Sequence, residues 1–279
     1  MNKLIFTLFL IVVCVSFSSA QDDEKIKGNR NVTIKQTYID PFTKIIVGED
    51  FSVEIIYNSK PSVEIETDDN LHQYIEFGVN AGVLTFKTTK RITSSKKMNI
   101  KVNYTDGLES IETMEDAEIR SLTSLELKKA TLKTSGSSRA YLNIRTANFD
   151  YVSSDKSKSK LNVNATAASS IILNDNSKVE ALLNSKTIKM DLYQKASANI
   201  EGTAETLDLR CDLSSSFNGK ELAANVCNLI AEGNSSATVR ANSTLIADIS
   251  GNSEVYFYGP AKITLNTFLG AAKLQKKEN

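Results

Sequence analysis

The 279-residue sequence has no tryptophan, a single histidine and no net charge, and these absences narrow its possible functions. The 33 basic side chains balance 33 acidic ones, which argues against a protein that wraps nucleic acid or coats an anionic membrane. Any Ser-His-Asp or Cys-His site would have to use His72, and no motif surrounds this residue. A zinc site built from histidines is excluded by count. We therefore predict no catalytic residues, no metal and no cofactor.

Long hydrophobic runs are missing after residue 20. Lys3 precedes an apolar stretch over residues 4–17, and the small residues of Ser18-Ser19-Ala20 follow it. This pattern is typical of a secretory signal peptide, and at about 1.5 Å per residue the stretch is too short for a roughly 30 Å hydrocarbon core. A bacterial lipoprotein anchored through Cys14 is the alternative. We predict export to the periplasm or cell surface, with no membrane-spanning segment in the mature chain.

The second half of the sequence repeats with a period of about nineteen residues. From Ile111 onward, two short runs of alternating apolar and polar residues flank a small polar turn. Alternation with period two predicts strands, and no segment shows the 3.6-residue period of a helix. We therefore predict an all-β fold, a parallel β-solenoid of about nine coils. The third residues of the predicted turns are Ala117, Ser138, Ser157, Ser177, Ala198, Phe217, Ser235, Ser253 and Ala272.

The turns share a residue type that tolerates a left-handed backbone. Gly136, Gly233 and Gly251 fall at one turn position, and Asp155 and Asp175 replace glycine there in other coils. Glycine adopts positive φ freely, and Asp tolerates it better than most residues. Together with Asp116, the two aspartates could instead bind a cation or act as an acid pair. We interpret them as turn residues, because glycine takes the same place elsewhere.

Cys211 and Cys227 are the two cysteines beyond the predicted signal peptide. An even pair in an oxidising compartment invites a disulfide. The predicted repeat register places them diagonally on adjacent coils, about 8 Å apart between Cα atoms. Since a disulfide requires less than about 6.8 Å, we predict two buried free thiols.

The first third of the sequence also reads as β structure, with less regular spacing. We expect a solvated leader over residues 21–28, a β section over 29–105 that packs on or continues the solenoid and caps its edge, repeats over 106–274 and a charged tail over 275–279. The strands predicted in the β section are Asn31–Gln36, Lys44–Val47, Phe51–Tyr57, Ser62–Glu66, Gln73–Val79, Val83–Thr88 and Met98–Tyr104.

Short motifs in a fixed order connect this sequence to a known family. Asp69-Asn70-Leu71 and Ala81-Gly82-Val83-Leu84 precede Ser135-Gly136-Ser137-Ser138, and Tyr258-Gly259-Pro260 closes the series. Together they resemble the head GIN domain family, a Bacteroidetes-type domain of unknown function labelled as an auto-transporter adhesin. The resemblance covers most of residues 29–274. It implies a right-handed parallel β-helix at the periplasm or cell surface, and it implies no reaction.

Two groups of side chains are the candidate binding residues. Lys156, Lys158 and Lys160 alternate, so one coil could show three lysines on one face and grip an acidic glycan. Tyr256 and Tyr258 are opposite in phase to the apolar Val255 and Phe257, which suits sugar stacking or a partner contact. The ordinary alternatives are a solvated strand and packing under the last turn.

The sequence as a whole predicts an exported, non-enzymatic cell-envelope protein that binds through the surface of a β-solenoid. The expected partner is a cell-surface glycan or an envelope protein, and no nucleic acid is expected. A polysaccharide-active β-helix enzyme, either a lyase or a hydrolase, is one alternative. An accessory protein that binds another exported protein is the other.

Overall fold

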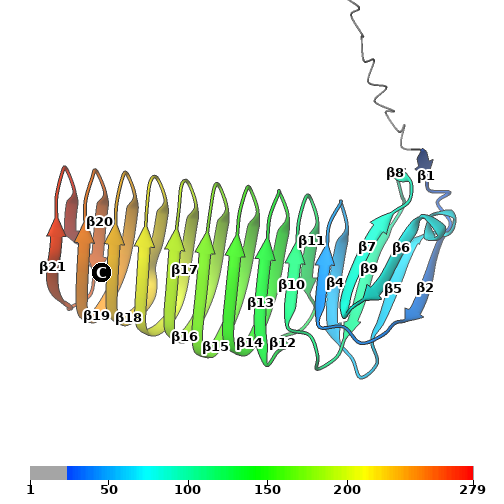
Figure 1. The fold of residues 1–279 in the computed structure, drawn as a ribbon, viewed down its shortest axis with the longest axis horizontal. Coiled ribbons are helices and arrows are strands. Elements are labelled where there is room, and N and C mark those ends of the chain that lie inside the picture. The colour runs from blue at the N-terminus through cyan, green and yellow to red at the C-terminus, as the bar shows by residue number, and fades with distance from the viewer. Residues whose placement is uncertain (1–23, 279) are drawn as a thin grey trace, which may run out of the picture.

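The computed structural model describes residues 24–278 as a nearly all-β chain whose coils stack along one long axis (Figure 1). Each coil contains a strand that enters a tight turn and a strand that leaves it. The strands entering the turns pair in parallel to form one sheet, which we call the pre-turn sheet, and those leaving form the post-turn sheet. The predicted parallel β-solenoid is confirmed.

Six long strands supply both sheets, because the chain bends within each of them. In β14, for example, the first half pairs in the post-turn sheet and the second half in the pre-turn sheet, with a register shift between Thr146 and Asn148 at the bend. These strands are β14 (Arg139–Ser153), β15 (Lys158–Leu173), β16 (Lys178–Leu192), β17 (Ser197–Cys211), β18 (Ser216–Ala231) and β19 (Ser236–Ile249).

Shorter strands complete the two sheets. The pre-turn sheet also contains β3 (Lys44–Val47), β10 (Ser110–Thr113), β13 (Lys129–Thr134) and β21 (Lys262–Phe268). The post-turn sheet also contains β4 (Ser52–Tyr57), β11 (Glu118–Ser121), β12 (Leu125–Glu126), β20 (Glu254–Tyr258) and β22 (Lys273–Lys276).

The core is a set of apolar rows between the two sheets. Inward residues alternate with outward ones along each strand, and parallel pairing brings equivalent inward residues together on successive coils. One row runs through Ile144, Val163 and Leu183, all buried. Each coil thus buries its apolar side chains against its neighbours, so the stack is stabilised cooperatively.

The turns confirm most of the predicted positions. Gly136, Asp155, Asp175, Gly233 and Gly251 all have positive φ, as does Gly270 in the last turn. In each of these turns the third residue is small, and in all but the last it is buried.

Two predicted turns are wrong by two residues. The left-handed residues there are Gln194 and Leu213, with φ of 59° and 57°, so the turns end at Ala196 and Ser215 rather than at Ala198 and Phe217. A slip of two residues preserves the alternation of inward and outward side chains, which is why periodicity did not reveal it. Ala196 and Ser215 are buried at the third position, as are the small residues there in most of the other turns.

The N-terminal part of the chain covers one end of the stack by a permuted order of strands. β3 and β4 form a coil that pairs with β10 and β11. On its other side lie β7 (Val83–Thr88) and β9 (Met98–Tyr104), which come later in the chain. Antiparallel strands then cover this layer: β6 (Ile75–Asn80) pairs with β7, β5 (Ser62–Asp68) with β9, and β2 (Val32–Tyr38) with β5.

Two details of this region and one at the C-terminal end differ from the sequence prediction or were not predicted. Gln73, predicted in a strand, lies in a 3-10 helix, η1 (Asp69–Tyr74). β1 (Lys25–Lys27), within the expected leader, pairs with β8 (Arg91–Ser94), which the sequence did not predict. At the other end, β22 extends through Lys276, into the expected tail. Short strands of this kind are not bounded by turn residues at both ends, so the sequence pattern does not reveal them.

The predicted signal peptide over residues 1–20 lies outside the described residues. Over residues 24–278, no helix has the length and apolar character needed to cross a membrane.

Both cysteines of the repeats are buried and free, which confirms the prediction of two thiols. Their predicted offset was wrong, because the turn after Cys211 ends at Ser215. Leu207, four residues before Cys211, pairs with Cys227. The two sulfur atoms are therefore separated by four residues along the strand rather than two.

Neither thiol should react with a maleimide until the chain unfolds. Burial raises the pKa of each thiol from 9.0 to about 12 and excludes the reagent, so the reactive thiolate is scarce. Peptide mapping after labelling with and without urea measures this, and native labelling of Cys211 would contradict the placement. As pH rises above 9, thiols of the unfolded chain release protons first, so stability should fall between pH 9 and about 12.

Candidate functional site

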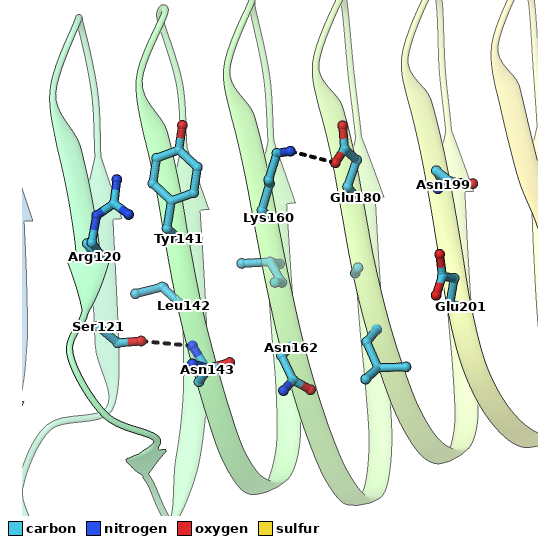
Figure 2. A pocket seen from close by; sticks show the side chains of 13 residues that line it. Arg120, Ser121, Tyr141, Leu142, Asn143, Lys160, Asn162, Glu180, Asn199 and Glu201 are labelled. Carbon is cyan, nitrogen blue, oxygen red and sulfur yellow. Dashed lines mark hydrogen bonds and ion pairs between the residues drawn. The ribbon is translucent and has the colours of Figure 1, made fainter.

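The outward side chains of the post-turn sheet form a broad polar surface, which we call the polar face. Its centre is a shallow, open depression of about 480 Å³ over β11 and the first halves of β14 to β17 (Figure 2). Six of the side chains that border it are charged, aromatic or amide groups that could contact a ligand: Arg120, Tyr141, Lys160, Asn162, Glu180 and Asn199.

Strand register places five of these side chains in one row across five successive strands. Arg120 pairs with Tyr141, Tyr141 with Lys160, Lys160 with Glu180, and Glu180 with Asn199. Successive members are about 4.8 Å apart in their backbones, the spacing between paired strands. The row is visible from left to right in Figure 2.

Charge contacts hold the row in place. The Arg120 guanidinium lies 4.6 Å from the centre of the Tyr141 ring, and it forms an ion pair of 3.0 Å with Glu118. Lys160 Nζ lies 2.9 Å from a Glu180 carboxylate oxygen. The hydrogen bond and charge of Glu180 raise the pKa of Lys160, so this lysine is cationic at neutral pH.

A second row of amides borders the first. Asn143 pairs with Asn162 on the next strand, and the Asn143 backbone N–H donates a hydrogen bond of 2.9 Å to Ser121 Oγ. Both asparagine side chains are exposed. An aromatic ring next to free amides on an open surface can stack against an apolar ring face while the amides bind hydroxyl groups.

The two predicted tyrosines lie on the same sheet, toward its C-terminal end. Tyr256 belongs to the row of Lys160 and follows it through Asn218 and Thr238. The Tyr258 ring lies 5.2 Å from Lys220 Nζ and 5.9 Å from the Arg240 guanidinium carbon. The tyrosines thus share the polar face with Lys160 but stand about five strands away from it.

The three predicted lysines do not form one cluster. Lys158 and Lys160 point outward from β15 on the polar face, whereas Lys156 lies in the preceding turn, where its backbone N–H donates to the Gly136 carbonyl. What the sequence reasoning missed is the role of neighbouring coils, which supply Tyr141, Glu180 and Asn199. Comparing equivalent positions of successive repeats, rather than neighbours within one repeat, could have found them.

His72, the single histidine, lies in η1 at the N-terminal end of the fold. Its Nε2 atom is 3.0 Å from Thr33 Oγ1. Partial burial and the nearby Lys35 lower its pKa, so the imidazole is neutral at pH 7. It is remote in the fold from the depression on the polar face.

Asp155 and Asp175 serve the turns, as their left-handed φ values of 59° and 58° indicate. Each side chain also accepts a hydrogen bond from the preceding coil: Asp155 Oδ2 from the Gly136 N–H at 2.9 Å, and Asp175 Oδ2 from the Asp155 N–H at 3.1 Å. Asp116 lies one place later in its turn and does not join this series. Among residues 24–278, no group of His, Cys, Asp and Glu side chains has the geometry of a metal site.

Substitutions of Asp175 separate a turn role from a cation role. Asp175→Asn keeps the acceptor oxygen and the tolerance of positive φ, so we expect little change in stability. Asp175→Ala loses both and should destabilise the fold by about 1–2 kcal/mol. Urea unfolding with and without Ca²⁺ measures this. Calcium-dependent stability that Asp175→Asn abolishes would contradict the turn role.

Comparison with known proteins agrees with this architecture. The family described as "Putative auto-transporter adhesin, head GIN domain" matches residues 41–174 and 159–261. No similar protein is found among the curated proteins.

Solved structures share the fold at low sequence identity. A crystal structure described as a putative adhesin from Parabacteroides distasonis is 21% identical, with a TM-score of 0.64, covering 91% of this chain and 100% of that one. One from Parabacteroides merdae, also described as a putative adhesin, is 20% identical, with a TM-score of 0.60 and coverages of 91% and 99%. A structure described as a putative lipid binding protein from Parabacteroides distasonis is 16% identical, with a TM-score of 0.63 and coverages of 91% and 100%. Because the family matches span most of its length, the chain belongs to the head GIN domain family.

Proposed function

We propose that this protein is an exported, non-enzymatic binding module of the cell envelope that attaches to glycans through its polar face. The observation that carries the proposal is the row from Arg120 to Asn199, which combines an aromatic ring, an amide and paired charges on an open surface beside the second row of amides. Family membership supports the adhesive role, because the family is described by that activity.

The geometry of the depression favours a bound chain over a small molecule. The depression is shallow, and it lies across strands from five consecutive coils rather than within a closed cavity (Figure 2). Small-molecule sites are typically concave and bury most of the ligand. A polymer can instead gain affinity from several weak contacts repeated along its length.

The signal-like residues 1–20 support export, and the exposed amide groups on the polar face support a carbohydrate ligand. Tyr141 would stack on the apolar face of a sugar ring, while Asn162 and Asn199 would bind its hydroxyl groups. The ion pair of Lys160 and Glu180 offers both a donor and an acceptor in a fixed position.

A glycan array, followed by an assay for products, tests this proposal. We expect the purified chain to bind one or more polysaccharides without releasing reducing ends or unsaturated sugars. Release of either product would replace the proposal with a polysaccharide-active enzyme. Absence of glycan binding, together with stoichiometric capture of one exported protein from the cell envelope, would replace it with an accessory protein.

A further inference from the structure

Three cations form a ladder on the polar face at the ends of three successive turns. Arg139 begins β14, Lys158 begins β15 and Lys178 begins β16, and strand register pairs the first with the second and the second with the third. All three side chains are exposed. The ladder lies two residues along each strand from the row that contains Tyr141, Lys160 and Glu180.

None of these three side chains has an acidic partner among the described residues. The thirteen ion pairs of residues 24–278 include Lys160 with Glu180 and Lys273 with Glu254, in which opposite charges face each other on adjacent coils. Neighbouring like charges on paired strands are destabilising. The ladder therefore places three like charges on adjacent strands without an ion pair, and we call this row of cations the cationic strip.

The nearby carboxylates form no ion pair with the cationic strip. Glu118, which precedes Arg139 in the register, forms its ion pair with Arg120. Asp155 and Asp175 direct carboxylate oxygens to backbone N–H groups in the turns. The ladder thus remains available to an anion from solution.

We infer that the glycan bound by the polar face is a linear acidic polysaccharide that lies along the long axis of the solenoid, with its carboxylates on Arg139, Lys158 and Lys178. This inference rests on the proposed glycan-binding function and names the class of ligand. The cations repeat at about 4.8 Å, close to the length of one pyranose ring in an extended glycan. The tyrosine and amides of the neighbouring row then contact the sugar rings themselves.

Other polyanions fit the surface less well. The phosphates of each strand of a B-form duplex advance by about 3.4 Å per residue along the helix axis, which is shorter than the coil spacing. An anionic membrane would favour cations spread widely over one face, whereas the chain as a whole has no net charge. The adjacent Asn143 and Asn162 also offer hydrogen bonds suited to hydroxyl groups.

Binding of polygalacturonate and of its methyl ester, which shares the backbone but lacks the charge, tests the inference. The triple variant Arg139→Gln, Lys158→Gln, Lys178→Gln should bind polygalacturonate at least about tenfold more weakly, and the salt dependence of binding should fall by about one unit of slope per cation. The matched control removes three exposed cations that lie elsewhere and have no ion pair: Lys133→Gln, Lys186→Gln and Lys262→Gln. It should bind like the unaltered chain.

The outcomes separate this inference from the proposed function. If the unaltered chain binds both polymers and the triple variant binds them equally well, the acidic-glycan assignment is overturned. The proposed glycan-binding function would then still stand. Stronger binding of oligothymidylate or of phosphatidylglycerol vesicles through the same three residues would overturn it in favour of nucleic acid or membrane. An unchanged or higher melting temperature of the triple variant, expected because like charges are removed, excludes misfolding as the cause of lost binding.

Discussion

Replacing Gly202 with alanine should destabilise the fold by about 3 kcal/mol or more, since the added methyl group meets backbone. Gly202 lies in β17 with φ of 125°, a conformation that residues with a side chain rarely adopt. An added Cβ would lie 2.2 Å from the Leu183 carbonyl oxygen on the preceding coil. That carbonyl is fixed by the parallel ladder, so neither coil can move without breaking pairs on both sides.

Gly78→Ala is the matched control for this experiment. Gly78 lies in β6, has no atom within 4 Å of the added Cβ, and does not have positive φ. Its alanine variant should unfold within about 0.5 kcal/mol of the unaltered chain. Urea unfolding of both variants measures the difference. Equal midpoints would show that the strands containing Leu183 and Gly202 are not stacked as described.

Phe217→Ala should cost about 3–5 kcal/mol, through loss of a large buried ring. Phe217 is 1% exposed, and its partners on the adjacent coils are Ala198 and Ala237. Because the neighbours in this core row are alanines, the large ring occupies space that their small side chains leave open. The ring also packs over Gly219 on the same strand. The variant leaves three consecutive alanines, which cannot close the cavity.

Phe217→Leu, which keeps most of the volume, should cost clearly less than Phe217→Ala. Thermal unfolding of both variants provides the comparison, and amide exchange should rise first in β17, β18 and β19, which contain the row. A loss below about 1 kcal/mol for the alanine variant would contradict the packing between the two sheets.

The sequence predicted the solenoid because its coils repeat. Period-two alternation within a strand shows which residues face inward and which face outward, without knowledge of the neighbouring strands. Glycine or aspartate marks turns such as those at Gly136 and Asp175. The turns at Gln194 and Leu213 escaped prediction, because neither residue type signals a left-handed backbone. The Gln194 side chain nevertheless makes the same contact as an aspartate in other turns: its Oε1 accepts a hydrogen bond from the Asp175 backbone N–H.

The permuted N-terminal layer could not be predicted for a different reason. Its strands pair with partners far away in the sequence: β9 joins β4, and β7 joins β3. Most of its strands were nevertheless predicted, since each has its own alternation. The order in which strands pair depends on which sheet edges are still unpaired, and the sequence of a single strand does not contain this information.

The candidate site was predicted only in the parts that lie within single strands. Lys158, Lys160, Tyr256 and Tyr258 alternate with buried neighbours and so were recognised as outward residues. Tyr141 and the ladder of Arg139, Lys158 and Lys178 acquire meaning from contacts between coils. Those contacts depend on coil lengths of 18 to 21 residues, and an error of two residues in one turn shifts the expected pairing of that coil with its neighbours.

The central claim is that the polar face is the binding surface, and Tyr141 tests it most directly. Tyr141→Ala should weaken binding of the glycan identified on the array by about tenfold, because the variant loses both the buried area of the ring and its stacking contact, which together need to supply about 1.4 kcal/mol. Tyr38→Ala, which removes a 68% exposed tyrosine from β2 at the N-terminal end, is the control. We predict that isothermal titration will show loss of affinity for Tyr141→Ala and none for Tyr38→Ala. Unchanged affinity of a folded Tyr141→Ala variant would contradict the claim.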